Sequence, residues 1–117
     1  MYKRQGLGRT GALLCCDHEG VRPDMVTLGK ALSGGVYPVS AVLADRRVLG
    51  LFRPGDHGST FGGNPLASAI ARASLDVLVD EGLVDRSREI GAYFMGRLKR
   101  IESDHIEDCL LYTSRCV

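Results

Sequence analysis

A single lysine follows a short run of residues typical of a β-strand, and it is the strongest candidate for chemistry in this sequence. Met25–Leu28 lead to Gly29 and Lys30, and Gly34 and Gly35 follow in a loop of small residues. Glycines let the backbone turn sharply and approach a ligand closely, because they have no Cβ atom. The end of a strand in an open α/β sheet is also where such folds usually bind ligands. An amine partly withdrawn from water there loses some of its preference for the charged form, and a neutral lysine can form a Schiff base with a carbonyl. The alternative is an ordinary surface lysine in a loop.

A second candidate is the pair of hydroxyls at Ser59 and Thr60. They lie in a loop expected over residues 52–61, and Gly62 and Gly63 follow. Hydroxyls together with unpaired backbone N–H groups at a turn suit the oxygens of a phosphate. The alternative is that these hydroxyls only bond their own backbone.

Other residues with possible chemistry have weaker patterns. The glycine-rich segment Gly6–Gly11 lacks the following lysine and hydroxyl residue of a P-loop and has no strand before it, so a turn is the better interpretation. His57 has no acidic residue or cysteine at a spacing typical of a catalytic pair, and no catalytic role is assigned to it. The four cysteines, at positions 15, 16, 109 and 116, do not have the spacing of a metal site, and buried free thiols in a reducing compartment are expected.

Two strands and a short helix are expected around the candidate lysine. Met25–Leu28 predicts one strand, and Tyr37–Ala44 predicts a second strand that is buried on both faces. Asp45 is the expected N-cap of a short helix, and residues 17–24 are expected to form a polar loop.

Two longer helices are expected towards the end of the chain. Asn64 and Pro65 predict the start of the first, and Gly82 predicts its end. Its many small residues would let it pack close to a neighbour. In the second helix an apolar stripe is expected to face the core. The stripe consists of Ile90, Phe94, Leu98 and Ile101.

The composition is that of an ordinary globular segment. The 117 residues are 44% hydrophobic and 25% charged, with a formal net charge of +1, so nothing favours binding to nucleic acid. No apolar run is long enough to cross a bilayer, and the first residues lack the apolar core of a signal peptide. The expected location is therefore the cytoplasm, or the mitochondrial matrix in a eukaryote.

Several motifs occur in the order in which class III pyridoxal-phosphate aminotransferases carry them. They are Gly6–Gly11, Arg22–Asp24, Leu28–Gly35, Tyr37–Ala41 and Gly55–Pro65. From about Gly6 to about Arg100 the chain resembles this family, and within it most closely the branch that uses ornithine. The resemblance implies an α/β fold, namely part of the large domain of the fold type I architecture, leading into the start of the small C-terminal domain.

The resemblance also implies roles for three residues. Lys30 would be the catalytic lysine that binds pyridoxal 5'-phosphate through a Schiff base and moves a proton. Thr60, with Ser59 beside it, would contact the cofactor phosphate of a partner subunit, so that a homodimer shares its active sites. The implied reaction transfers the δ-amino group of ornithine to a 2-oxo acid such as 2-oxoglutarate, giving glutamate semialdehyde and glutamate. The alternatives are acetylornithine, succinylornithine or another class III aminotransferase, or an inactive truncated chain.

The ends of the chain depart from the family pattern. An Asp-Glu-x-Gln segment is expected immediately before the first glycines, and its aspartate, which would pair with the pyridine nitrogen, would fall at Met1. The chain is therefore interpreted as an internal fragment with both ends foreign to the gene. In this interpretation residues 1–5 are an unmatched end, and 6–82 are the late part of the cofactor-binding large domain. Residues 83–108 then begin the small domain, and 109–117 are an unmatched tail.

Overall fold

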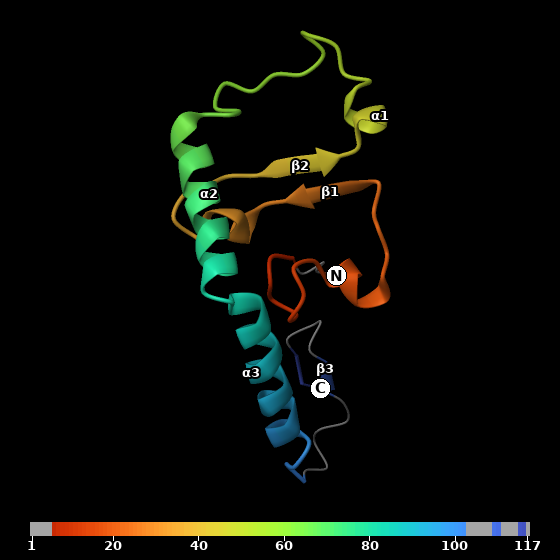
Figure 1. Cartoon of the computed structure of the whole chain (residues 1–117), viewed down its shortest axis with the longest axis vertical. Coiled ribbons are helices and arrows are strands. Elements are labelled where there is room, and N and C mark those ends of the chain that lie inside the picture. The colour runs from red at the N-terminus through yellow and green to blue at the C-terminus, as the bar shows by residue number, and fades with distance from the viewer. Residues whose placement is uncertain (1–5, 103–108, 111–114, 117) are drawn as a thin grey trace. The chain divides into compact units, whose positions relative to one another are not determined.

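The computed structural model describes residues 6–102, 109–110 and 115–116 and contains both helices and strands. The position expected to hold the pyridine-pairing aspartate lies outside the described residues. The elements, in chain order (Figure 1), are η1 (Cys15–Glu19), β1 (Met25–Leu28), η2 (Lys30–Ser33), β2 (Ala41–Ala44), α1 (Arg46–Leu49), α2 (Pro65–Asp80), α3 (Leu83–Leu98), β3 (Cys109–Leu110) and β4 (Arg115–Cys116). They form two compact units, of which one is Arg22–Val77 and the other holds the described residues before and after it. This division differs from the expected domain boundary after residue 82, which stays a prediction.

Strands β1 and β2 form a two-stranded antiparallel sheet in the unit Arg22–Val77. Their register runs from Met25 opposite Ala44 to Leu28 opposite Ala41, so the first predicted strand is confirmed. The second strand is shorter than the predicted Tyr37–Ala44, because β1 ends at Leu28 and leaves residues 37–40 without a partner.

The prediction that the second strand is buried on both faces is wrong. Val42 and Leu43 are consecutive residues of β2 and therefore point to opposite faces of the sheet. They are 50% and 53% exposed, respectively. Neither face of β2 is therefore covered by the described residues at these positions.

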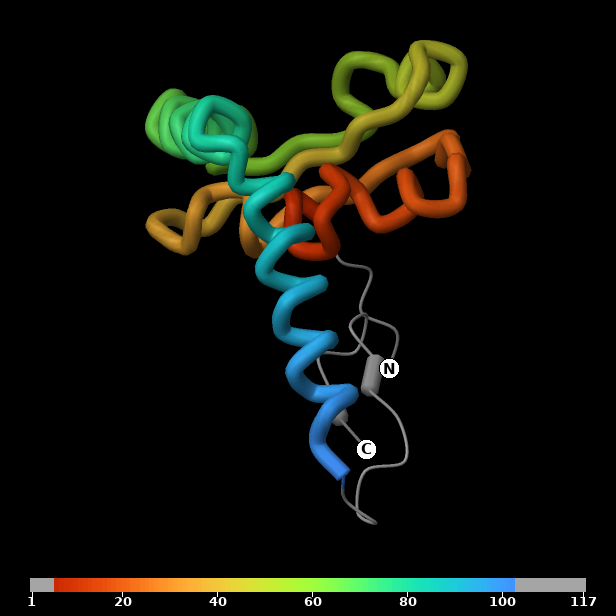
Figure 2. The backbone as a smooth tube through the Cα atoms, turned by 60° about the horizontal axis from the view of Figure 1, so that its bottom comes forward, coloured from red at the N-terminus to blue at the C-terminus, as the bar shows by residue number. Residues whose placement is uncertain are grey.

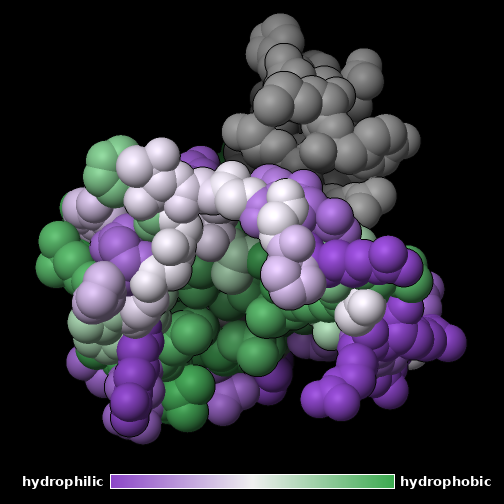
Figure 3. Space-filling model, turned by 90° about the horizontal axis from the view of Figure 1, so that it is seen from above, coloured by the Kyte–Doolittle hydropathy of each residue, from purple (hydrophilic) through white to green (hydrophobic). Residues whose placement is uncertain are grey.

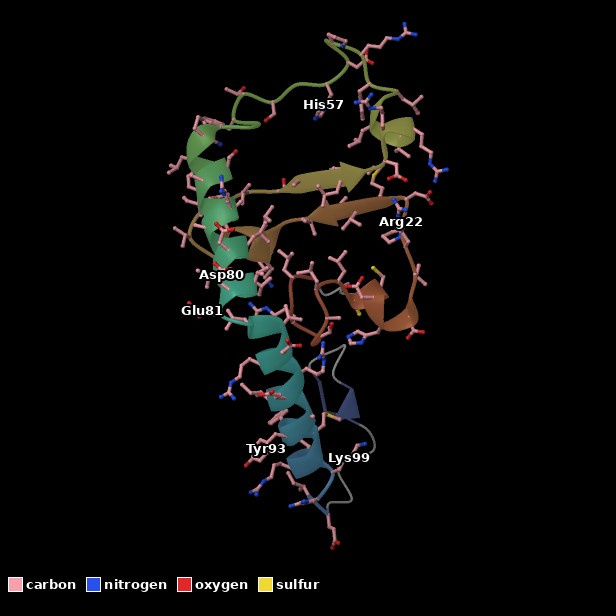
Figure 4. All side chains as sticks on the ribbon, in the orientation of Figure 1. Arg22, His57, Asp80, Glu81, Tyr93 and Lys99 are labelled. Carbon is pink, nitrogen blue, oxygen red and sulfur yellow. The ribbon has the colours of Figure 1, made fainter. Side chains whose placement is uncertain are left out.

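Two exposed ion pairs join the segments that flank the sheet. Arg22 donates to Asp45 at 3.0 Å, and Arg47 donates to Asp24 at 2.7 Å. Arg22 lies just before β1, as Figure 4 shows. Asp45 occupies the predicted N-cap position of α1, but its side chain makes no capping bond, so that part of the prediction is wrong. Its carboxylate is bonded to Arg22 instead.

Both ends of α2 agree with the prediction from the sequence. Asn64 Oδ1 accepts a hydrogen bond from the Ala67 N–H at 2.8 Å, and Pro65 is the first helical residue. At the other end Gly82 adopts φ +61° and donates its N–H to the Val79 carbonyl at 3.1 Å. Local capping chemistry therefore defines this helix at both ends.

The glycine-rich segment near the N-terminus forms a turn, as predicted. Gly6 pairs with Leu14, the Gly8 N–H donates to the Leu13 carbonyl at 3.1 Å, and the Gly11 N–H donates to the Gly8 carbonyl at 3.2 Å. The expected polar loop over residues 17–24 is partly wrong, because its first residues belong to η1.

The face that helix α3 turns inward differs in part from the predicted one. Ile90, Phe94 and Ile101 of the expected core-facing stripe are 50%, 54% and 53% exposed, whereas Leu98 of the same stripe is half-buried. The other less exposed positions of α3 are Val84, Ser87, Gly91 and Met95. The glycine-rich turn accounts for this difference, because it packs against the start of α3. A methyl group placed on Gly8 would lie 3.3 Å from a methyl carbon of Val84.

Few side chains are buried within the described residues. Leu32 and Ala67 are the buried hydrophobic residues there, at 4% and 5% exposure. Cys15 and Cys16 are free thiols, as predicted, but they are only partly buried. Much hydrophobic surface stays exposed, as the space-filling view shows (Figure 3). None of the described helices has the length and apolar character needed to cross a membrane.

Candidate functional site

Lys30 has an unusual backbone conformation. It lies two residues after the end of β1, is the first residue of η2, and adopts φ +49°, in the left-handed region that residues other than glycine rarely occupy. Gly29 is extended, and a Cβ there would lie at an ordinary 3.6 Å from Ser40 Cβ, so this glycine is not needed for a sharp turn. The residue that turns the chain is the lysine itself. Such strain persists only where surrounding structure imposes it, and it is found most often at functional sites.

The residues immediately after Lys30 anchor it. The Leu32 N–H donates to the Gly29 carbonyl at 3.2 Å, and the Gly34 N–H donates to the Ala31 carbonyl at 3.0 Å. Leu32 and Ser33 are only 4% and 2% exposed. Lys30 is exposed, so the described residues do not withdraw its amine from water, and that prediction is wrong. Lys30 therefore has an accessible amine, and Leu32 and Ser33, which follow it in the chain, are buried.

Ser59 and Thr60 lie in a tight turn of the long loop between α1 and α2. The Gly62 N–H donates to the Ser59 carbonyl at 3.2 Å, which places Thr60 at the tip of the turn. A Cβ on Gly62 would lie 3.0 Å from Ser59 Cβ, so a side chain at this position would crowd Ser59. Gly63 adopts φ +68° and leads the chain into α2.

Asn64 connects this turn to α2. Its Nδ2 donates to the Phe61 carbonyl at 2.9 Å, while its Oδ1 accepts from the N–H of Ala67 in the first helical turn. One side chain therefore caps the helix and holds the turn that carries Thr60. The sequence predicted the first of these bonds and not the second.

The turn also offers free hydrogen-bond donors. Within the described part of the chain, no backbone N–H of residues 57–61 donates a hydrogen bond, and neither hydroxyl of Ser59 and Thr60 is bonded. Both residues are exposed. The alternative in which these hydroxyls bond their own backbone is therefore not seen, and the donor set suits an anion such as phosphate.

Lys30 and the hydroxyl pair are not brought together within one chain. No hydrogen bond joins them among the described residues. Although both belong to the unit Arg22–Val77, η2 and the loop of residues 51–64 lie apart in both views (Figures 1 and 2). His57 lies in this loop, with its ring centroid 6.3 Å from that of Phe52 (Figure 4). Nothing in this arrangement gives His57 a catalytic role.

One contact beside the lysine was not predicted. A Cβ placed on Gly34, which adopts φ +61°, would lie 3.2 Å from Ser74 Oγ and 3.8 Å from Ser74 Cβ. Ser74 belongs to α2, whose many small residues predicted close packing against some neighbour. The sequence gives no sign that this neighbour is the turn after η2, because the two positions are far apart in the chain.

The residues present fit pyridoxal 5'-phosphate in their chemistry. The cofactor's aldehyde requires a primary amine, and Lys30 offers an exposed one that forms no salt bridge in the described structure. Its phosphate requires several donors, and the turn at Thr60 offers hydroxyls and unpaired N–H groups. Lys30 would hold the aldehyde carbon, and Thr60 with Ser59 would hold phosphate oxygens.

Comparison with known proteins agrees with these features. Residues 4–109 match the family model described as aminotransferase class-III. The chain is 66% identical over 96 residues to the ornithine aminotransferase of Bordetella pertussis, covering 82% of this chain and 23% of that protein.

Solved structures give the same result. The ornithine aminotransferase of Toxoplasma gondii is 50% identical with a TM-score of 0.86, over 89% of this chain and 25% of that one. The acetylornithine aminotransferase of Elizabethkingia anophelis is 55% identical with a TM-score of 0.79, over 81% of this chain and 24% of that one. The α/β class and the aminotransferase architecture predicted from the sequence are thereby confirmed. The chain spans about a quarter of the length of the relatives it matches.

Proposed function

Since the chain belongs to the class-III aminotransferase family, we propose that it supplies the cofactor lysine and phosphate-binding hydroxyls of a longer enzyme, an ornithine aminotransferase. That enzyme transfers the δ-amino group of ornithine to a 2-oxo acid such as 2-oxoglutarate. The observation that carries this proposal is the 66% identity to a protein named ornithine aminotransferase. In the proposed domain arrangement residues 6–82 belong to the large domain and 83–108 begin the small one.

Lys30 has two tasks in this reaction. Its Nζ atom would hold the cofactor between turnovers, and once released it would accept and return a proton at the substrate carbon. Both tasks need an amine that reaches the reacting atoms from a backbone held in place. The hydrogen-bonded η2, with its buried Leu32 and Ser33, supports this role. When bound, the cofactor supplies an electron sink.

Thr60 and Ser59 serve the active site of a second copy of the chain in this proposal. The loop that carries them is exposed throughout residues 51–63 and lies apart from η2 of the same chain (Figure 1). Those two features support a homodimer in which each subunit gives its lysine to one site and its hydroxyls to the other.

The role of Lys30 is tested in the full-length protein that carries this sequence. Borohydride reduction followed by peptide mapping should find the cofactor attached to Lys30. Lys30→Ala should abolish this attachment and the visible absorbance of the bound cofactor. Lys99→Ala is the matched control, because Lys99 is an exposed lysine directly after α3 (Figure 4). Attachment that persists in Lys30→Ala would overturn the proposal.

Mixed dimers test whether the site is shared. Thr60→Val removes a hydroxyl that bonds a charged group, so the cofactor dissociation constant should rise roughly 10- to 100-fold. A dimer of one Lys30→Ala subunit and one Thr60→Val subunit should regain one site of native cofactor affinity if Thr60 acts across subunits. If Thr60 acts within its own chain, no native site can form in that mixture, and the shared site is excluded.

The amino donor is tested by turnover. Ornithine should be the better amino donor. N-acetylornithine is the alternative donor to compare, because the Elizabethkingia anophelis structure to which the chain is similar is an acetylornithine aminotransferase. A higher kcat/KM for N-acetylornithine would assign the chain to that activity. If the longer protein turns over neither donor, the result would favour the alternative that the protein is inactive.

A further inference from the structure

We propose that Ser74 is a positioning residue for Lys30: the size of its side chain determines how closely the turn at Gly34 approaches α2, and thereby where the backbone places the lysine amine. The inference rests on the proposed role of Lys30. Ser74 is neither a ligand nor a proton donor in it, and acts only through packing.

The first step is the contact between the turn and the helix. Gly34 ends η2 in the left-handed region, and a Cβ on it would already lie 3.2 Å from Ser74 Oγ, closer than most carbon atoms approach in proteins. The turn therefore lies against Ser74, and a side chain on Gly34 would crowd the serine hydroxyl. All of these residues belong to the unit Arg22–Val77.

The second step is the short path from this contact to the amine. The Leu32 N–H bonds the Gly29 carbonyl and encloses Lys30 in a first turn, and the Gly34 N–H bonds the Ala31 carbonyl in a second turn that overlaps it. Leu32 and Ser33, at 4% and 2% exposure, are two of the most buried residues in the described structure. Because the two turns share residues, and Leu32 and Ser33 within them are buried, we expect them to move together when Gly34 is displaced.

The third step is that α2 itself is a firm support. It is capped at both ends, by Asn64 and by Gly82, and Ala67 on the same helix is 5% exposed. A larger side chain at position 74 should therefore displace the turn more readily than the helix. Packed contacts respond to added carbon atoms by backbone shifts, and a displacement of about 1 Å at a reacting group can cost roughly 100-fold in rate.

Isoleucine at position 74 tests this, because a β-branched side chain has one strongly preferred rotamer in a helix and cannot turn away. In the full-length protein, Ser74→Ile should lower kcat roughly 10- to 100-fold, with a smaller change in KM. Covalent trapping of pyridoxal phosphate at Lys30 by borohydride should slow, and amide hydrogen exchange of residues 29–36 should become faster. Ser74→Val is the milder variant should the isoleucine protein fail to fold.

Two further variants separate positioning from a loss of stability. Ala73→Ile places the same side chain on a neighbouring exposed position of α2, and it should trap cofactor at the wild-type rate. Ser74→Ala removes only the hydroxyl and should keep kcat within about twofold of wild type.

Three outcomes would overturn the inference. They are wild-type trapping and exchange in Ser74→Ile, an equal loss in Ala73→Ile, or a large loss in Ser74→Ala, which would show that the hydroxyl and not its size matters. If the wild-type protein itself traps no cofactor at Lys30, the proposed function fails instead. Exchange at residues 29–36 then still reports whether position 74 controls the turn.

Discussion

Replacement of Asn64 by alanine should loosen both the start of α2 and the turn that carries Thr60. The side chain makes one bond to each, at 2.8 Å to the Ala67 N–H and at 2.9 Å to the Phe61 carbonyl. Loss of an N-cap costs about 1 kcal/mol. Loss of a neutral hydrogen bond costs about 0.5–1.5 kcal/mol, and the low end applies because Asn64 is only half-buried. We expect a total near 1.5–2 kcal/mol, or amide exchange faster by roughly 10- to 30-fold at the hydrogen-bonded N–H groups of Gly62 and of residues 67–70.

Asn64→Asp separates the two bonds. Aspartate keeps an oxygen that accepts from Ala67, and its negative charge is favourable at a helix N-terminus, but it has no N–H for the Phe61 carbonyl. Exchange should therefore stay native in the first turn of α2 and become faster at the Gly62 N–H, whose bond to the Ser59 carbonyl closes the turn. Ser68→Ala is the control, because the Ser68 side chain is exposed and makes no hydrogen bond in the described structure. Native exchange in Asn64→Ala, or identical behaviour of the alanine and aspartate variants, would refute the dual role of Asn64.

Two predictions concern parts of the chain away from the candidate site. Gly11→Ala should destabilise the turn against α3 far more than Gly20→Ala, because a Cβ on Gly11 would lie 2.7 Å from Arg88 Cβ, whereas Gly20 has open space. Thermal unfolding should show a cost of about 1–2 kcal/mol for Gly20→Ala, from its left-handed backbone alone, and a larger cost for Gly11→Ala; equal costs would contradict this packing. A double-mutant cycle on Arg22 and Asp45 should give a coupling below about 1 kcal/mol that falls with added salt, because the side chains are 84% and 46% exposed. A coupling that is larger or insensitive to salt would show that the pair is shielded from water.

Features that depend on neighbouring residues were predictable from the sequence, whereas features that depend on distant contacts were not. The start of α2 follows from Asn64 and Pro65, and its end from Gly82, because capping involves residues within a few positions of each other. The length of β2 is determined by where β1 ends, so the predicted strand Tyr37–Ala44 was too long. The covered face of α3 is selected by the turn near the N-terminus, which packs against residues far along the chain.

The same distinction applies to the candidate site. Residue types alone indicated Lys30 and the hydroxyls of Ser59 and Thr60, and the structure adds how their backbones are held. No propensity predicts φ +49° at a lysine, because such a conformation persists only where the surrounding structure imposes it, and here the buried Leu32 and Ser33 follow directly. The separation of Lys30 from Thr60 within one chain bears on the proposed function. If one cofactor molecule binds both residues, they must come close together, and in the proposed homodimer a second copy of the chain supplies the missing partner. The mixed-dimer experiment tests this requirement directly, since only exchange between subunits can pair a native Lys30 with a native Thr60.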